Sequence, residues 1–230
     1  MLRTILQPLL VAVLFATIPK IHAATFSDGE RLSYEVTWPS GLGLGQTSFL
    51  ARATTEGWDF RMSVQALLPI LEIRDEYHAK ATMALCSTEF SKNTIHGQKK
   101  VKEQIRFDQR DHEATRSTMT GGKSTFPIPP CARDSLTFLY FLREQLAAGR
   151  IPPPDDVYFG AQYQVVLTYL ESRNIEVANT LHLTDRILIN IQGPKSELDF
   201  EIFFSKDEAR IPLLIRIPFE AGTFSLRLVQ

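Results

Sequence analysis

Apolar and polar residues alternate along most of this chain with a period of two residues. Leu32, Tyr34, Val36 and Trp38 alternate with polar neighbours, and residues 58–64 repeat the pattern. Successive side chains of a β-strand point to opposite faces of a sheet, so this alternation predicts strands with one apolar and one polar face. We expect further strands at residues 46–53, 72–84, 88–95, 101–108, 112–119, 163–169, 174–178, 183–191, 200–204 and 224–228.

Turn-forming residues separate these runs. The clearest are Ser40–Gly43, Glu56-Gly57, His96-Gly97, Gly121-Gly122 and Gly193-Pro194. Many strands at this spacing, joined by short turns, are typical of an antiparallel sheet with one face toward solvent.

The segment from Asp134 to Ala148 breaks the alternation and predicts a helix. Asp134 is a suitable N-cap, and Gly149 can adopt the left-handed conformation that ends a helix. Prolines on both sides isolate the segment as one element. Its apolar residues cover most of the circumference in the first two turns, so the helix must be buried on nearly all sides. They are Leu136, Phe138, Leu139, Tyr140, Phe141, Leu142 and Leu146.

A flat sheet cannot surround such a helix, whereas a sheet that curls around it can. We therefore predict a mainly β fold: a strongly curled antiparallel sheet, or half-barrel, with one buried α-helix at about 134–148. No repeat or clear domain boundary interrupts residues 24–230, so we expect a single domain there.

The N-terminus has the three regions of a secretory signal peptide. Arg3 supplies a positive charge, residues 9–18 form a short apolar run, and residues 19–23 end at Ala23. The run is shorter than the ~20 residues that span a bilayer. We expect cleavage after Ala23 and an exported protein, periplasmic or associated with the cell envelope; a membrane anchor that is never removed is the alternative. No later segment predicts a transmembrane helix.

Charge excludes one class of partner. Removing Arg3 and Lys20 from the 25 basic residues leaves 23, against 26 acidic residues, a formal charge of −3. A general nucleic-acid binder usually carries a basic face, so we expect no nucleic-acid partner.

The two cysteines, Cys86 and Cys131, both lie after the predicted cleavage site. Two cysteines in an oxidising compartment predict one disulfide, worth roughly 4 kcal/mol on the chain-entropy model. Two buried free thiols and a catalytic cysteine are the competing interpretations.

Four segments resemble one family, in the same order along the chain. Gly29–Trp38 reads GERLSYEVTW, Phe107-Asp108 ends a middle strand, Asp134–Arg143 reads DSLTFLYFLR, and Phe204–Pro212 reads FSKDEARIP. Together they resemble the bacterial domain-of-unknown-function family 3108, with Thr137-Phe138 where Ser-Ala is usual and Phe204 where Trp is usual.

The resemblance implies an exported protein with a mainly antiparallel fold around one helix. It implies no known reaction and no agreed catalytic residues. The expected shape is similar to the half-barrels that carry lipoproteins or lipids across the periplasm, although a shared fold does not determine function.

Other candidate chemistry is weak, and we expect no enzyme activity, cofactor or metal. Asp199 and Glu201 share the polar face of a strand, where solvated carboxylates are usual. The histidines and cysteines lack metal-ligand spacing. His96 lies near three lysines, a pattern usual for a charged hairpin tip, although it would also attract an anionic head group.

The aromatic residues support two hypotheses about function. If the curl leaves a gap beside the helix, aromatic and aliphatic side chains would line a site for an apolar molecule such as a lipid or acyl chain. The alternative is a solid core, in which case the protein is a structural or protein-interaction module of the cell envelope. The candidate cavity-lining residues are Tyr34, Trp38, Phe60, Phe138, Tyr140 and Phe141.

Overall fold

The computed structural model describes residues 25–68, 71–194, 197–219 and 222–229. The predicted signal peptide, residues 1–23, lies outside this part of the chain. One helix, α1 (Ser135–Ala147), accompanies the strands. The strands are β1 (Arg31–Thr37), β2 (Gly43–Ala53), β3 (Gly57–Leu68), β4 (Leu71–Thr82), β5 (Ser87–His96), β6 (Lys99–Asp108), β7 (Glu113–Thr118), β8 (Lys123–Pro127), β9 (Arg133–Asp134), β10 (Asp155–Tyr158), β11 (Gln162–Val177), β12 (Thr180–Gln192), β13 (Glu197–Ser205), β14 (Pro212–Phe219) and β15 (Gly222–Leu228).

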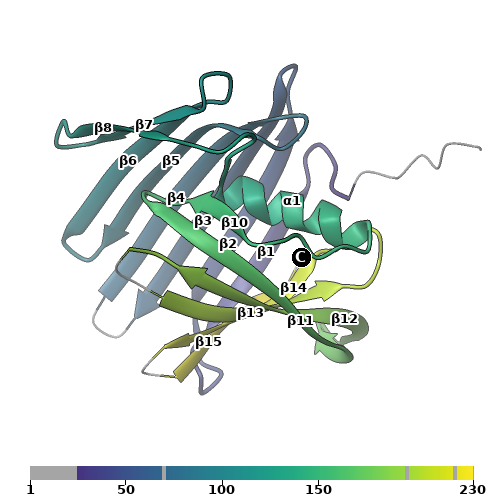
Figure 1. The fold of residues 1–230 in the computed structure, drawn as a ribbon. Coiled ribbons are helices and arrows are strands. Elements are labelled where there is room, and N and C mark those ends of the chain that lie inside the picture. Colours follow the sequence, from purple (N-terminus) through teal and green to yellow (C-terminus); the bar gives the residue numbers. More distant parts are fainter. Residues whose placement is uncertain (1–24, 69–70, 195–196, 220–221, 230) are drawn as a thin grey trace, which may run out of the picture.

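All of these strands form one sheet, in the order β8-β7-β6-β5-β4-β3-β2-β1-β15-β14-β13-β12-β11-β10-β9 (Figure 1). Neighbours are antiparallel except β9 and β10, which are parallel. Because β1 pairs with β15, the two ends of the folded chain meet in the middle of the sheet. Each remaining pair of neighbours is consecutive along the chain, so nearly the whole sheet is a meander.

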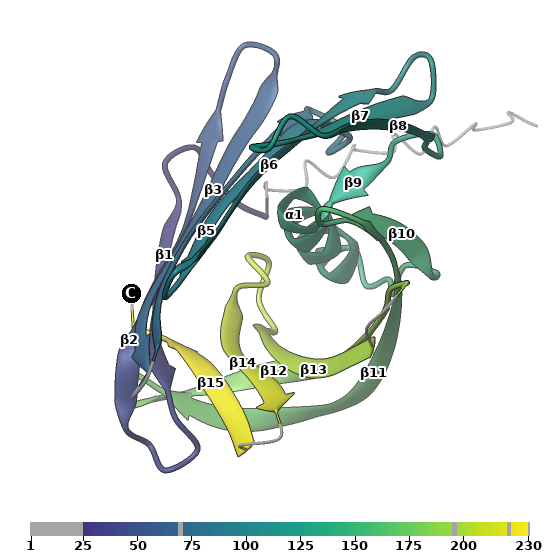
Figure 2. The ribbon, with the colours of Figure 1, turned by 90° about the vertical axis from the view of Figure 1, so that its left-hand side faces the viewer.

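The sheet curls into an open spiral with α1 inside it, near the gap between the two sheet edges (Figure 2). The edges are β8 and β9. A backbone hydrogen bond of 3.0 Å from the Ser87 amide to the Ala132 carbonyl connects β5 to the segment just before β9. The predicted curled antiparallel sheet around one helix is therefore confirmed, and the sheet is not closed.

The N-terminus of α1 is fixed by a buried cap. The Asp134 carboxylate accepts hydrogen bonds from the amides of Leu136 and Thr137, as predicted for an N-cap, and also from the Ser87 hydroxyl on β5. Gly149 follows the helix with a φ of 71°, the left-handed conformation expected there. The cap therefore anchors the helix to the sheet as well as satisfying its first amides.

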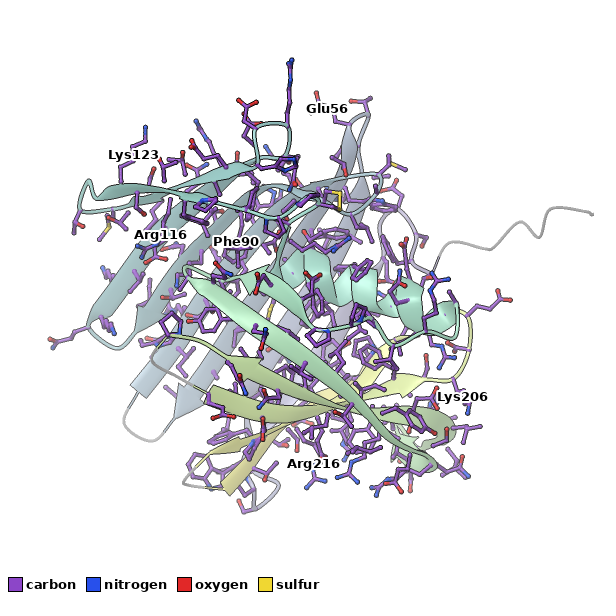
Figure 3. All side chains as sticks on the ribbon, viewed as in Figure 1. Glu56, Phe90, Arg116, Lys123, Lys206 and Arg216 are labelled. Atoms are coloured by element: carbon purple, nitrogen blue, oxygen red, sulfur yellow. A yellow bond between two sulfur atoms is a disulfide. The ribbon has the colours of Figure 1, made fainter. Side chains whose placement is uncertain are left out.

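Most of the apolar surface of α1 is enclosed, as its sequence requires, and Leu139 and Phe141 remain partly exposed. Tyr140 stacks on Phe60 of β3 with ring centroids 4.0 Å apart, and Phe26 meets Tyr140 edge-on at 4.9 Å. Side chains fill the space between the helix and the strands (Figure 3). The buried residues of the helix are Leu136, Thr137, Phe138, Tyr140, Leu142, Arg143 and Leu146.

A second, smaller apolar cluster lies outside the main core. The far end of β11 brings Ile175 and Val177 against Phe203, Leu213 and Leu214. Both faces of β14 are thereby covered, which explains why its sequence does not alternate and why we did not predict it as a strand. The predicted strands 163–169 and 174–178 are one continuous strand, β11, with a bulge between Tyr169 and Glu171.

The predicted disulfide between Cys86 and Cys131 is present, with Cα atoms 4.5 Å apart. Cys86 lies between β4 and β5, and Cys131 lies between β8 and β9. The bond therefore fastens the entrance of α1 to the sheet, at the seam where the spiral remains open.

We expect the disulfide to stabilise the fold by restricting the unfolded chain. Its loop spans 45 residues, for which loop entropy gives about 4 kcal/mol. Denaturant unfolding of the oxidised protein and of the C86A/C131A variant should show a loss of that order. Coincident unfolding midpoints would contradict this role.

Candidate ligand-binding site

The six aromatic residues predicted to line a cavity lie in two different surroundings. Tyr34, Phe60, Phe138 and Tyr140 are buried in the main core. Trp38 and Phe141 are only partly buried at its margin. Burial raises the pKa of Tyr34 far above its usual range, and its neutral hydroxyl donates to the Pro212 carbonyl at 2.8 Å.

The structure does not bring these six side chains to one place. Phe60 and Tyr140 stack on each other. Trp38 instead contacts Phe224 of β15, with centroids 4.8 Å apart. Phe141 packs beneath the Arg133 guanidinium, 3.7 Å from the ring centroid. The aromatic residues nearest α1 therefore fill the core around the helix.

Apolar side chains that face inward but remain partly exposed occur at the end of the curled sheet that lies away from α1. This open end carries the β1–β2, β12–β13 and β14–β15 hairpins. Ile217 pairs with Phe224 across β14 and β15, and Trp38 contacts the same phenylalanine. We call the following partly buried residues the apolar wall: Trp38, Ile191, Phe200, Ile217 and Phe224.

The inner surface of β4 and β5 is more polar toward the same open end. Tyr77 belongs to the core, and Asp75, two residues away on β4, therefore faces inward as well. Asp75 is 8% exposed and accepts hydrogen bonds from the Tyr77 hydroxyl at 2.9 Å and from His96 Nε2 at 2.9 Å. Burial, reinforced by the neighbouring Asp75, raises the pKa of Tyr77 far above its usual range.

A partly buried ion cluster lies next to this polar surface. Lys92 Nζ is 3.3 Å from the Glu103 carboxylate, which also binds Arg116. The β10–β11 turn covers the cluster, with Phe159 5.0 Å from Lys92 Nζ. Gly160 has a φ of 77°, and a side chain there would collide with Lys92 and Glu103. The turn therefore packs closely against β5 and β6, across the seam of the spiral.

The end of the curl nearest the C-terminus of α1 is closed by Arg143. Its guanidinium is 1% exposed and binds the Glu30 carboxylate at 2.6 and 2.9 Å. It also donates to the Ala209 carbonyl at 2.9 Å and to the Thr25 carbonyl at 3.0 Å. One side chain therefore joins the helix, the segment before β1 and the β13–β14 loop.

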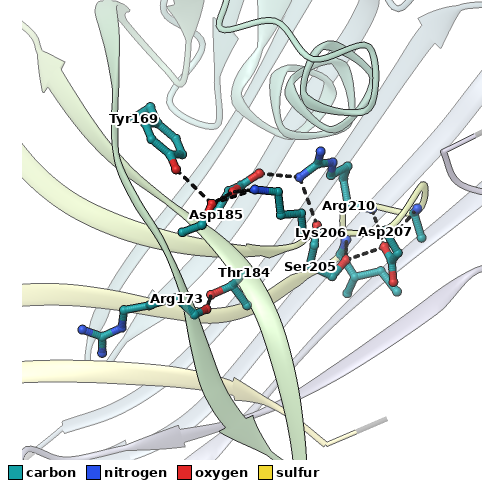
Figure 4. Close-up of polar contacts among 11 residues, drawn as sticks. Tyr169, Arg173, Thr184, Asp185, Ser205, Lys206, Asp207 and Arg210 are labelled. Carbon is teal, nitrogen blue, oxygen red and sulfur yellow. Dashed lines mark hydrogen bonds and ion pairs between the residues drawn. The ribbon is translucent and has the colours of Figure 1, made fainter.

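A second polar network lies on β11, β12 and the β13–β14 loop (Figure 4). The Asp185 carboxylate accepts hydrogen bonds from Ser172 and from Arg210, at 2.6 Å for the latter, and lies 3.3 Å from Lys206 Nζ. Burial alone would raise the pKa of Asp185, but these three partners together lower it below its usual range. The network holds the β13–β14 loop against β12.

Comparison with known proteins identifies the family. A family model described as "Protein of unknown function (DUF3108)" matches residues 33–229. This chain belongs to the DUF3108 family. The resemblance noted in its sequence is confirmed.

A crystal structure of a β-barrel-like protein of the domain of unknown function DUF1849 from Brucella abortus is similar in fold to the DUF3108 chain. Its TM-score is 0.62 at 9% sequence identity, over 87% of this chain and 95% of that one. No curated protein matches the DUF3108 chain. Among the described residues, no helix is long and apolar enough to cross a membrane.

The family-like segments of this DUF3108 chain have structural roles. Glu30 and Arg143, from the first and third segments, form the buried ion pair. In the fourth segment, Asp207 Oδ1 accepts from the amides of Ala209 and Arg210. In the second, Asp108 Oδ1 binds the amides of the following turn. These contacts hold backbone segments in place.

The candidate carboxylates Asp199 and Glu201 lie on the outside of the sheet. Glu201 binds Arg186 and Asp199 binds Asn190, in cross-strand contacts of a polar face. His96 is at the end of β5, as expected for a hairpin, but it binds Asp75 on the inner surface. Our sequence reasoning missed the Arg143–Glu30 pair; an arginine within an otherwise apolar helix was the available signal.

We expect Arg143→Met to destabilise the protein by about 3–5 kcal/mol, because it leaves the Glu30 carboxylate without its buried partner. Chemical denaturation measures the loss. The double variant E30M/R143M should recover a large part of it, since no unpaired charge remains. Arg150→Met, on an exposed arginine just after the helix, is the control and should change stability by less than about 0.5 kcal/mol. An equally small change for R143M would contradict the assigned role.

Asp185 should stabilise the fold in a pH-dependent way. Its lowered pKa means that its contribution is complete above the usual pKa of an aspartate, about 4, and is lost as the pH falls through the folded-state value. Asp185→Asn should therefore cost roughly 1–2 kcal/mol at pH 7. The difference between the variant and the natural chain should shrink below about pH 4. Thermal unfolding across pH checks this, and a difference that grows in acid would contradict it.

Proposed function

We propose that this DUF3108 domain binds an apolar molecule, such as a lipid or acyl chain, at the open end of its curled sheet. The observation that carries the proposal is the contrast in burial along the interior. Most apolar side chains of α1 are buried, with Leu139 and Phe141 partly exposed, whereas every member of the apolar wall at the open end is partly exposed. Partly exposed apolar side chains that line a concave surface are typical of ligand sites.

The composition of the apolar wall favours a flexible hydrocarbon. Its members are branched aliphatic and aromatic side chains, and Ile191 and Phe200 come from strands β12 and β13, which are neighbours in the sheet. Covering such a surface with an apolar ligand gains about 25 cal/mol per Å² removed from water. The polar residues Asp75 and His96 on β4 and β5 would then lie beside any polar part of the ligand.

The proposal includes action outside the cytoplasm. The N-terminal pattern of residues 1–23 and the disulfide between Cys86 and Cys131 both favour an exported, oxidised protein. An exported carrier would protect an apolar molecule from water while it crosses an aqueous compartment.

The dense packing around α1 favours the second candidate, a solid-core module of the cell envelope. Phe60, Tyr140 and Phe26 contact one another directly in the core. The two candidates differ in one measurable property, namely whether the purified protein carries an apolar ligand.

We expect organic extraction and native mass spectrometry of the full-length protein, purified without detergent, to detect a bound apolar molecule. Added oleate should also bind. Phe200→Arg places a charge on the apolar wall and should weaken oleate binding about tenfold or more.

The matched control is Leu181→Arg. Leu181 is 68% exposed near the β11–β12 turn, and its replacement should leave oleate binding unchanged. Circular dichroism establishes that both variants fold. A natural chain that carries no apolar molecule and binds no oleate would contradict the proposal and favour the solid-core module.

A further inference from the structure

A hollow lies on the outer face of the sheet, opposite α1. Its volume is about 930 Å³, and it extends over β1 to β7. Ser63 lies between Met62 and Val64, which face the interior, so its side chain points outward into the hollow. We call this feature the outer hollow. Its outward-facing lining residues are Arg31, Ser48, Leu50, Arg61, Ser63, Glu76, His78, Glu89, Ser91, Asn93, Lys102, Gln104, Ser117 and Met119.

Two rows of side chains cross the strands to form its floor. In the first row, Ser48 pairs with Ser63, Ser63 with Glu76, and Glu76 with Asn93. In the second row, Arg61 pairs with His78, and His78 pairs with Ser91. Ser91 in turn pairs with Gln104, and Gln104 with Ser117. Serines recur in both rows, and their short side chains leave room between the longer charged ones. The hollow thus follows from side-chain length on a twisted sheet.

Several polar groups on this floor have no protein partner. Within the described part of the chain, the side chains of Ser91, Asn93, Gln104 and Ser117 make no hydrogen bond to protein. Ser48 and Ser63 are hydrogen-bonded only to each other, at 2.9 Å. Hydroxyl and amide groups both donate and accept hydrogen bonds. The floor therefore presents donors and acceptors that no other side chain of the described residues engages.

The charges of the outer hollow nearly cancel. Arg31, Arg61 and Lys102 are balanced in large part by Glu76 and Glu89. Arg61 and His78 are further engaged by Asp59, at 3.1 and 2.8 Å. A site of this kind does not select a strongly charged ligand.

These properties exclude most macromolecular partners. A nucleic acid would need a basic surface. The centre of a protein interface is usually enriched in aromatic side chains and depleted of serine and charged residues, the reverse of this floor. A lipid would need an apolar lining. A ligand with many neutral hydroxyl groups matches mixed donors and acceptors without net charge.

We propose that the outer hollow binds an uncharged oligosaccharide. Neighbouring strands are about 4.8 Å apart, so the rows from β2 to β7 span about 24 Å perpendicular to the strands. An extended sugar chain would lie along these rows, with its hydroxyls on Ser91, Asn93 and Gln104. Leu50 and Met119 supply apolar surface for the sugar carbons. This site is separate from the apolar wall, on the other face of the sheet.

The test uses the full-length protein and two uncharged probes, cello-oligosaccharides and N-acetylated chito-oligosaccharides. Isothermal titration measures affinity, and NMR follows the side-chain amides of Asn93 and Gln104. Ser91→Trp fills the hollow and should weaken oligosaccharide binding about tenfold or more. Arg52→Trp, on the same outer face but outside the lining, is the matched control and should bind as the natural chain does.

Oleate binding distinguishes this inference from the proposed function, because S91W should leave it unchanged. The site is supported if added oligosaccharide shifts the side-chain amide signals of Asn93 and Gln104 in the natural chain and in R52W but not in S91W. The inference would be overturned if neither oligosaccharide binds, or if S91W binds them as tightly as the natural chain does. Preferential binding of heparin over both neutral probes would also overturn it, since it would show selection for negative charge.

Discussion

Burial of α1 is the constraint on which the rest of this structure depends. A helix that is apolar on nearly every side has no stable position on a flat sheet, because half of its surface would remain in water. In this protein one continuous sheet, with edges β8 and β9, curls around the helix. Tyr140 stacked on Phe60 shows how directly the strands contact it.

The spiral remains open, so it needs fastenings other than strand pairing. The Cys86–Cys131 disulfide and the Ser87–Asp134 hydrogen bond fix the start of the helix to the sheet. Arg143 fixes its other half to the segment before β1 and to the β13–β14 loop. A buried guanidinium is costly unless it is fully paired, and the Glu30 carboxylate and two backbone carbonyls satisfy it. The family-like segments of the sequence contribute several of these contacts.

The same geometry divides the surface of the sheet into regions with different chemistry. Near α1 the inner face is filled with apolar side chains, and toward the open end the apolar wall is only partly covered. The outer face carries short polar side chains around a hollow. One sheet thus offers an apolar concave surface and a polar hollow on opposite sides, because side chains of a strand alternate between its two faces.

The sequence by itself determined the local structure wherever a strand has one buried and one solvated face. The alternation around Tyr34 and Phe60 and the cap at Asp134 are physical requirements of single elements, so they could be recognised without the fold. β14 could not, since Leu214 and Ile215 are buried on opposite faces and leave no alternation. The curl of the sheet could be inferred because the helix itself carries the evidence, in its apolar circumference.

Only the tertiary structure decided which side chains share a site. The sequence placed Trp38 and Phe60 in one group, but strand register and curvature send Trp38 to Phe224 and Phe60 to Tyr140. The pairing of Glu30 with Arg143 joins residues 113 positions apart, and the rows of the outer hollow depend on the register of six strands. Contacts of this kind depend on how distant segments are brought together, and no local pattern of residues encodes that arrangement.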